Sequence, residues 1–208
     1  MKLIAILALA GTAVIVAIGA ALFGTRARAR RRLAVGGTNL EEGAIVTITG
    51  TVRLLDGAVL TAPLSAQACV AYTVRAIERK TTRTVVGAVG ALVPVAVGES
   101  KLVPFALVLA DRTVIVDGTE AELVLPVYPI IPRKLEREHA FLRAHGISAE
   151  LVQQHAFEEV KVVAGDKVSV QGMVVAVVDR TAETIRAPGI ELRLVAYEDH
   201  PLTIGEPR

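Results

Sequence analysis

The sequence predicts a mainly β protein with one or two short helices, an OB-like small β-barrel domain that follows an N-terminal transmembrane helix. Three observations lead to this prediction. A stretch of 22 residues from Leu3 to Gly24 is apolar or small apart from Thr12. After position 40, many short segments alternate with period two, which is typical of half-buried strands. Two of these segments share a glycine-marked pattern that suits a strand coiling round a small barrel.

Residues 1–25 are predicted to be a transmembrane anchor. As a helix, the 22 residues would span about 33 Å, against a hydrocarbon core of about 30 Å. A cleaved secretory signal is the alternative, because small residues such as Gly19 and Ala20 suit a signal peptidase. The anchor is favoured, because signal peptides usually have apolar regions of about 7–15 residues.

Residues 26–39 are predicted to be an arginine-rich juxtamembrane linker. Its five arginines, here called the arginine collar, are Arg26, Arg28, Arg30, Arg31 and Arg32. Basic residues beside a membrane helix tend to stay in the cytoplasm, so we expect a single-pass cell-membrane protein whose soluble domain is cytoplasmic. The collar can also contact anionic headgroups, or it can be a solvated topology signal only. The lipid bilayer is therefore the first expected partner.

The charge and the cysteine usage exclude several functions. The first 32 residues hold six basic side chains and no acidic one, which leaves 17 basic against 21 acidic residues in the remainder. An acidic domain argues against nucleic acid as a partner, because phosphate binding needs a clustered basic surface. Cys69 is the single cysteine, so neither an intramolecular disulfide nor a thiolate-rich zinc site can form within the chain.

Residues 40–208 are predicted to form one β domain. Asp56-Gly57 indicates a two-residue hairpin, and Ala110–Arg112 indicates a second turn. The predicted strands are Ile45–Val52, Leu54–Leu55, Ala58–Leu60, Cys69–Ile77, Phe105–Leu109, Thr113–Val116, Glu120–Val127, Val160–Val163, Lys167–Val178 and Ile190–Ala196. A helix is predicted from Arg133 to His145, ended by Gly146, and a shorter one from Ala149 to His155 with Ser148 as its cap.

An internal similarity links the two ends of this domain. Glu42–Val52 and Ala164–Val174 align at a constant offset of 122, and both read G-x-x-V-x-[IV]-x-G-x-V. We expect the first glycine to turn the chain into a strand and the second to permit a sharp bend or bulge. Chance similarity between two β-strands is the alternative, because such patterns are degenerate.

Val85–Val97 is a separate apolar segment of thirteen residues without a charge or a hydrogen-bonding side chain. It is too short to span a membrane as a helix. A buried strand pair is the simpler interpretation. An apolar loop that dips into the bilayer beside the anchor is the alternative.

Several of these segments resemble the BAM or GIDE domain when they are read in order. They are Gly50-x-Val52, Leu60-Thr61-Ala62-Pro63-Leu64-Ser65, Cys69-Val70-Ala71-Tyr72, Pro104-Phe105 leading to Asp111, and Glu159 before Gly165-Asp166-x-Val168-x-Val170-x-Gly172. The family takes its name from mitochondrial E3 ubiquitin ligases of the MULAN type, in which the domain lies beside a membrane, and it also occurs in bacterial membrane proteins. The resemblance covers roughly residues 40–205.

The sequence departs from that family in three ways. Ala66 stands where a glycine often follows the serine, and neither a second transmembrane helix nor a RING follows the domain. A RING needs about eight Cys and His ligands, whereas this chain has one Cys and four scattered His. We therefore expect a non-enzymatic interaction or scaffold module with an unidentified protein partner. The alternatives are a component of a ubiquitin-ligase-like activity, implied by the resemblance, and a lipid- or peptide-binding barrel.

The sequence offers no catalytic, cofactor-binding or metal-ligating set. The candidate interaction loop is Ala62, Pro63, Leu64 and Ser65, where Pro63 fixes φ and lacks a donor, so that the segment leaves the strand ladder. Its alternative role is packing, because no catalytic partner accompanies it. Cys69 is interpreted as a small core residue rather than a nucleophile. His139 and His145 lie six positions apart on the predicted helix, which puts them on different faces and disfavours metal binding by the pair.

Overall fold

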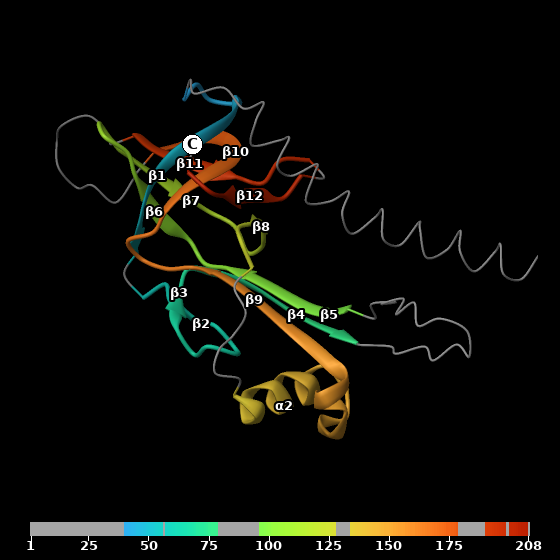
Figure 1. Ribbon diagram of the computed structural model, residues 1–208. Coiled ribbons are helices and arrows are strands. Elements are labelled where there is room, and N and C mark those ends of the chain that lie inside the picture. Colours follow the sequence, from blue (N-terminus) through green and yellow to red (C-terminus); the bar gives the residue numbers. More distant parts are fainter. Residues whose placement is uncertain are drawn as a thin grey trace, which may run out of the picture.

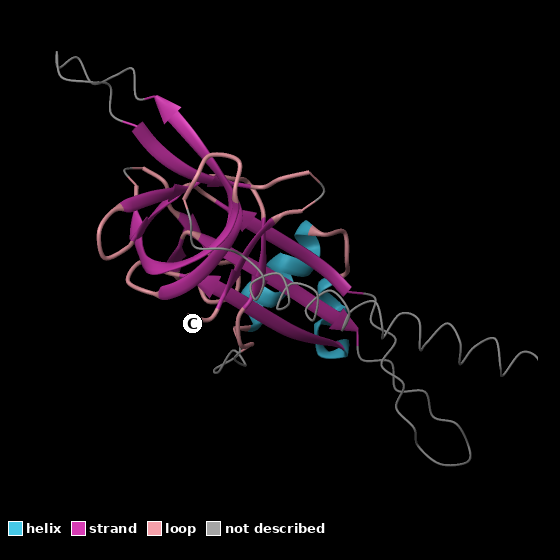
Figure 2. Ribbon diagram, turned by 90° about the horizontal axis from the view of Figure 1, so that it is seen from above, coloured by secondary structure: helices cyan, strands magenta, loops and turns pink. Residues whose placement is uncertain are grey.

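The computed structural model describes residues 40–55, 57–78, 96–127, 134–178, 190–198 and 200–207. The fold is mainly β, with a closed five-stranded barrel at one end and a helix at the other (Figure 1). The barrel strands curl round a ring when the molecule is seen from above (Figure 2). The predictions of the sequence for 1–39, which include the anchor and the arginine collar, lie outside the described residues.

The barrel strands pair in the order β1-β6-β7-β11-β10 and back to β1. Their bounds are Ile45–Leu54 (β1), Phe105–Val108 (β6), Thr113–Val116 (β7), Lys167–Val178 (β10) and Ile190–Val195 (β11). All junctions are antiparallel except β7–β11, which is parallel. Beside that parallel junction, Arg193 Nη1 lies 2.6 Å from Asp117 Oδ2. Two short strands, β12 (Leu202–Gly205) and β8 (Ala121–Val124), extend the barrel sheet from β10.

The internal similarity of the sequence corresponds to a local two-fold relation between β1 and β10. The two strands are antiparallel, and Ile48 pairs with Val170, its own equivalent at the offset of 122. Because the axis passes through that pair, each of the other residue pairings between the two strands has an equivalent pairing on the opposite side of the axis. One backbone hydrogen bond, Gly43 N to Val174 O at 2.8 Å, recurs as its equivalent, Gly165 N to Val52 O at 2.9 Å. Gly43 and Gly165, at φ +80° and +90°, turn the chain into the two strands as predicted.

The second glycine of each repeat lies where another segment comes very close. A Cβ atom on Gly50 would lie 2.7 Å from Val108 O, and one on Gly172 would lie 2.7 Å from Leu202 Cδ2. One residue further along, at Thr51, β1 gains β6 as a partner, and at Met173, the equivalent position, β10 gains β11. The glycines therefore permit each strand to bend from one partner to the next, which closes the barrel.

A second sheet of three antiparallel strands, here called the side sheet, runs from the barrel toward the helix (Figure 1). Its order is β5-β4-β9, with β5 at Ala96–Leu102, β4 at Ala71–Glu78 and β9 at His155–Val162. The helix α2 (Leu135–Ala144) and the 3-10 helix η1 (Ala149–Gln154) lie beside it, and a small hairpin joins β2 (Leu60–Thr61) to β3 (Ala68–Cys69). Phe141 and Leu142 of α2 share a hydrophobic cluster with Tyr72, Val74 and Ala76 of β4.

Most of the predicted elements are confirmed, and the differences have physical reasons. The hairpin predicted at Asp56-Gly57 was wrong, because the strands on its two sides, β1 and β2, do not pair with each other. Instead β1 pairs with β10 and β6, and β2 pairs with β3. β12 was not predicted, although all four of its residues are buried. Ser148 precedes η1 without a side-chain hydrogen bond to it. β5 was not predicted as a strand either, because only its first two residues fall in the apolar segment Val85–Val97, and β9 begins at His155 instead of Val160. The other strands and α2 lie within a few residues of their predicted bounds.

The barrel core is aliphatic apart from Phe105. Side chains from all five barrel strands are fully buried and interdigitate there: Val52, Phe105, Leu107, Val114, Val116, Val170, Val174 and Leu194. The cluster continues into the near end of the side sheet through Ala71, Leu102 and Val162. The two parts of the domain are therefore joined by packing as well as by the chain.

Candidate functional site

The candidate interaction loop, Ala62–Ser65, closes the hairpin between β2 and β3. Ala62 and Leu64 point inward and are 0% and 2% exposed, whereas Pro63 and Ser65 are half-buried. Ala66 follows at φ +56°, and its N–H donates to Ala62 O at 2.8 Å. The turn is therefore held by its own backbone, and only alternate side chains of the loop can reach a partner.

A buried carboxylate anchors this loop to the side sheet. Glu159 of β9 has a side chain that is 1% exposed, and it accepts hydrogen bonds from Leu64 N at 2.7 Å and from Ser65 N at 3.2 Å. From the other direction, Arg137 Nη1 of α2 donates to Leu64 O at 3.2 Å. Two successive backbone N–H groups form an anion-binding concavity, and here the anion is part of the chain. The contacts explain how the loop is fixed, which agrees with the packing interpretation of its inner half.

Cys69 lies beneath the same loop. Its side chain is 1% exposed, and its Sγ lies 3.8 Å from Leu60 O. Burial, together with the negative charge of Glu159, raises the pKa of the thiol to about 11. Only the thiolate is a nucleophile, so this thiol is unreactive at neutral pH. The geometry agrees with a packing role.

The side sheet carries two rows of charged residues on the face that α2 covers. In one row, Glu99 and Glu159 flank Val74, and in the next, Lys101 and Lys161 flank Tyr72. Each strand therefore places a glutamate beside a lysine two residues further on. Lys101 Nζ lies 2.6 Å from Glu99 Oε1, and Lys161 Nζ lies 3.7 Å from Glu159 Oε1.

The two glutamates differ in exposure, and so in what they can do. Glu99 has a side chain that is 26% exposed, and it accepts a hydrogen bond from Tyr72 Oη at 2.5 Å. His145 Nε2, at the end of α2, lies 3.7 Å from the other oxygen of Glu99. Lys101 and Tyr72 lower the pKa of Glu99, and burial together with Glu99 raises the pKa of Tyr72 to about 12. The cluster keeps Glu99 charged and Tyr72 protonated at neutral pH, which suits recognition rather than proton transfer.

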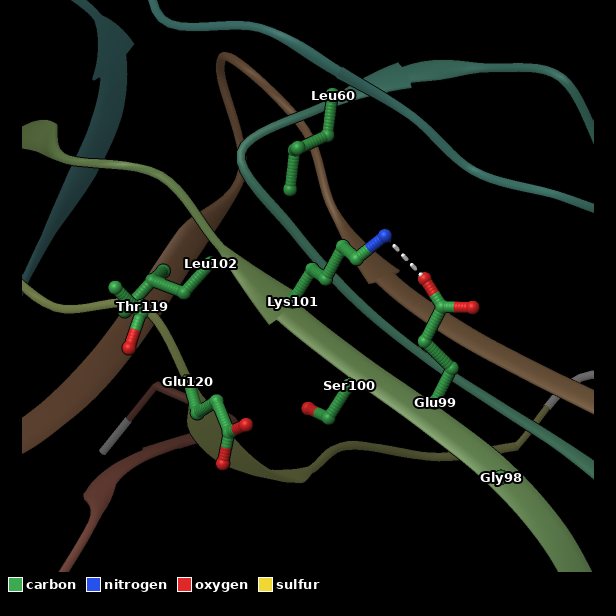
Figure 3. A pocket seen from close by; sticks show the side chains of 8 residues that line it. All are labelled: Leu60, Gly98, Glu99, Ser100, Lys101, Leu102, Thr119 and Glu120. Carbon is green, nitrogen blue, oxygen red and sulfur yellow. Dashed lines mark ion pairs between the residues drawn. The ribbon is translucent and has the colours of Figure 1, made fainter.

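A groove of about 540 Å³ runs along β5 next to this cluster (Figure 3). It is lined by Leu60, Gly98, Glu99, Ser100, Lys101, Leu102, Thr119 and Glu120. Sequence reasoning did not single out these residues. The usable signal was the repeated E-x-K pattern, at Glu99–Lys101 and Glu159–Lys161, in the two outer strands of one sheet.

Other predicted sites are not placed by the structure. The arginine collar, Arg26 to Arg32, and residues 85–95 of the apolar segment Val85–Val97 lie outside the described residues. Within the described ranges, no helix combines the length and the apolar character needed to cross a bilayer. The same ranges contain no group of three or more His, Cys, Asp and Glu side chains suited to a metal ion. His145 faces Glu99, as described above, and His139 is half-buried.

Comparison with known proteins adds no assignment, because no family model, curated protein or solved structure matches the chain. The chemistry of the described surface is therefore the basis for a functional proposal.

Proposed function

We propose that this chain is a single-pass membrane protein whose GIDE-like domain acts at the bilayer as a non-enzymatic interaction or scaffold module. One observation carries the proposal: in the side sheet, no other described strand pairs with the outer edge of the strand β5, which lies next to a groove that residues of both faces of the sheet line. The reactive groups nearby are engaged in internal contacts, as Glu159 and Cys69 show. Such a surface suits binding rather than chemistry.

The strand order supports an OB-like description of the barrel. Counted within the barrel, the fourth strand, β10, returns after a long connection to lie beside the first, β1, and this is the Greek-key arrangement. The OB fold is a five-stranded Greek-key barrel. In this description the side sheet is built from two insertions, one between the first and second barrel strands and one between the third and fourth.

The contact between Glu159 and the Ala62–Ser65 loop supports the GIDE resemblance. Both elements belong to the pattern on which the resemblance rests, and they are 95 positions apart at Leu64 and Glu159. A ubiquitin-ligase activity is not part of the proposal, because one Cys and four His in the whole chain cannot supply the roughly eight ligands of a RING.

The membrane part of the proposal rests on the sequence of residues 1–39. The 22 apolar residues can cross a bilayer, and the arginine collar favours a cytoplasmic domain. The net surplus of acidic residues after position 32 would keep the domain itself from lying flat on anionic lipid. The domain would thus remain available to a protein partner.

Membranes that contain the full chain test the proposal. The protein should remain in the pellet after carbonate extraction and should resist protease added outside intact cells, and a lysine-reactive crosslinker should give a discrete adduct in those membranes. Recovery of a soluble chain that begins near Arg26 would overturn the anchor. Digestion of the domain from outside would overturn the topology, and a chain that crosslinks to no protein would overturn the interaction role.

A further inference from the structure

The outer edge of β5 has backbone groups that point away from the sheet. Among the described strands, β5 pairs only with β4. Val103 N donates to Val70 O, while Leu102 N donates to Thr119 O on the opposite side, so the backbone groups of Leu102 point outward. Because these directions alternate along a strand, the N–H and C=O groups of Ser100 and Gly98 also point outward. Among the described residues, the edge is therefore closed by Thr119 at Leu102, and no strand pairs with it from Ser100 back toward Ala96, although Ser100 Oγ donates to Ala121 O at 3.0 Å.

The groove lies where an added strand would run. A paired strand would sit about 4.8 Å from β5, and the groove of about 540 Å³ is lined by β5 residues of both faces together with Thr119 and Glu120, which lie beyond its outer edge. Figure 3 shows Leu60, Glu99 and Lys101 on one side of β5 and Ser100 and Glu120 on the other. The side chains of an added strand alternate between the same two sides. Gly98 has no side chain there and permits close approach of another backbone.

The charges along the groove select the chemistry of the occupant. On one side, Glu99 is neutralised by Lys101 and bonded to Tyr72, which leaves Leu60 as the apolar contact. On the other side, Glu120 is exposed and has no charged partner among the described residues. The groove thus presents a free carboxylate on one side and an apolar contact on the other. An extended peptide with alternating basic and apolar side chains complements both.

We propose that the β5 edge binds an extended basic segment of a partner protein as an additional antiparallel or parallel strand. This inference rests on the proposed function and names the chemistry of its partner. Backbone hydrogen bonds to Gly98 and Ser100 supply affinity, and the contact with Glu120 supplies selectivity.

A second copy of the chain fits this edge less well. Its own Glu99 and Lys101 would be complementary in a β5–β5 pair centred on Ser100. That register, however, puts Gly98 of the second copy opposite Leu102, where Thr119 already accepts the Leu102 N–H. The edge is therefore more suitable for a short peptide than for its own symmetry mate.

The test uses the full chain in neutral detergent and a fluorescein-labelled heptapeptide of alternating valine and lysine as the probe, with fluorescence anisotropy as the readout. The valine–lysine peptide should bind at least tenfold more tightly than an alternating valine–glutamate peptide. Methylation of one alternate set of its backbone amides should abolish binding, and methylation of the other set should not. Glu120→Lys should weaken binding at least tenfold.

The matched protein variants are Gly98→Pro and Gly98→Ala. Both add a Cβ atom at the same tight position, 3.1 Å from Val74 O, but only proline removes the outward N–H. Binding should be lost in Gly98→Pro and retained in Gly98→Ala, with similar melting curves for the two. The methylated peptides decide the question without any change to the protein if Gly98→Pro fails to fold.

Three results would overturn the inference. Equal binding of both methylated peptides would mean charge attraction only, and a concentration-dependent dimer that Gly98→Pro abolishes would mean that a second copy takes the edge. An adduct that still forms in membranes with Glu120→Lys and Gly98→Pro would place the partner elsewhere; the proposed function would stand and this inference would fall. Absence of any adduct in the unaltered chain would instead overturn the proposed function.

Discussion

The barrel and the side sheet use β-structure in opposite ways. In the barrel, each of the five strands has a partner on both sides, and the interior is aliphatic apart from one phenylalanine. Among the described strands of the side sheet, only the central strand β4 has two partners, and the covered face holds glutamates, lysines and a tyrosine. Closing a sheet removes its edges, whereas an open sheet leaves backbone groups free to pair. The difference indicates that the barrel supplies stability and the side sheet supplies recognition.

The largest expected effect comes from the barrel core. Phe105→Ala removes a fully buried ring at the centre of the main cluster and should lower the free energy of unfolding by about 3–5 kcal/mol. Urea denaturation measures it. Leu54→Ala is the matched control, because Leu54 pairs with Phe105 across the strands yet is 39% exposed. A cost below about 1 kcal/mol is expected for it. Equal costs for the two variants would contradict the assignment of the barrel as the stabilising part.

The second effect should be confined to the side sheet. Glu159→Ala leaves the buried N–H group of Leu64 and the half-buried N–H group of Ser65 without their acceptor, at a cost of about 2–3 kcal/mol. Amide hydrogen exchange should accelerate in residues 60–78 while the barrel amides stay protected. Glu150→Ala, at an exposed position of η1, is the control and should change neither. Uniform acceleration through the barrel would show that the two regions open as one cooperative unit.

The reactivity of the Cys69 thiol measures local unfolding of the same region, residues 60–78, in the unaltered protein. At pH 8 its thiol, with a pKa of about 11 against an ordinary 9.0, should react with a thiol reagent about 100-fold more slowly than an exposed cysteine, because of its smaller thiolate fraction alone. Burial slows the reaction further. In Glu159→Ala the labelling should become faster, and in the Leu54→Ala control it should stay slow. Rapid labelling of the unaltered protein at pH 8 would mean that the side sheet opens readily by itself.

Sequence reasoning succeeded where the relevant pattern is local. The glycine and valine pattern of β1 and β10 states where each strand begins and bends, so their equivalence was visible at the offset of 122. It failed where the partner decides the outcome. Asp56-Gly57 is a sound local hairpin signal, yet β1 pairs with β10 and β6 instead. In that arrangement the valines of β1 are buried in the main hydrophobic cluster. β12 follows Pro201 and ends at Gly205, so that only Leu202 and Ile204 alternate as apolar residues, too few for a periodicity to be read.

The side sheet was the harder part to foresee for the same reason. Glu159 and the Ala62–Ser65 loop were both noted in the sequence, but no periodicity states that a carboxylate will accept hydrogen bonds from amides 95 positions away. The groove depends on Thr119 closing one end of β5 and leaving the other end open. Such features arise from tertiary pairing, which a single sequence does not encode locally.

The smallest effect concerns Tyr72, and its pH dependence identifies the cause. Tyr72→Phe removes the hydrogen bond to Glu99, which should cost about 1 kcal/mol at pH 7, since Glu99 is partly exposed. The pKa of Tyr72 is raised to about 12 from an ordinary 10.0, so its contribution to stability is complete below pH 10 and is lost as the pH rises through 12.

The same sign analysis applies at the acidic end of the profile. Lys101 and Tyr72 lower the pKa of Glu99, so its contribution to stability is present above its ordinary pKa of 4.5 and is lost as the pH falls through the lowered value. The stability difference between the unaltered protein and Tyr72→Phe should therefore be a plateau from about pH 5 to pH 10 that declines on both sides. Urea denaturation at one-unit pH intervals measures it. Tyr197→Phe, which keeps the ring beside His200, controls for loss of a hydroxyl elsewhere. A difference that stays constant to pH 11.5 would show that the Tyr72 hydroxyl does not stabilise the side sheet through its hydrogen bond to Glu99. Recognition at β5 would then not depend on how this carboxylate is held.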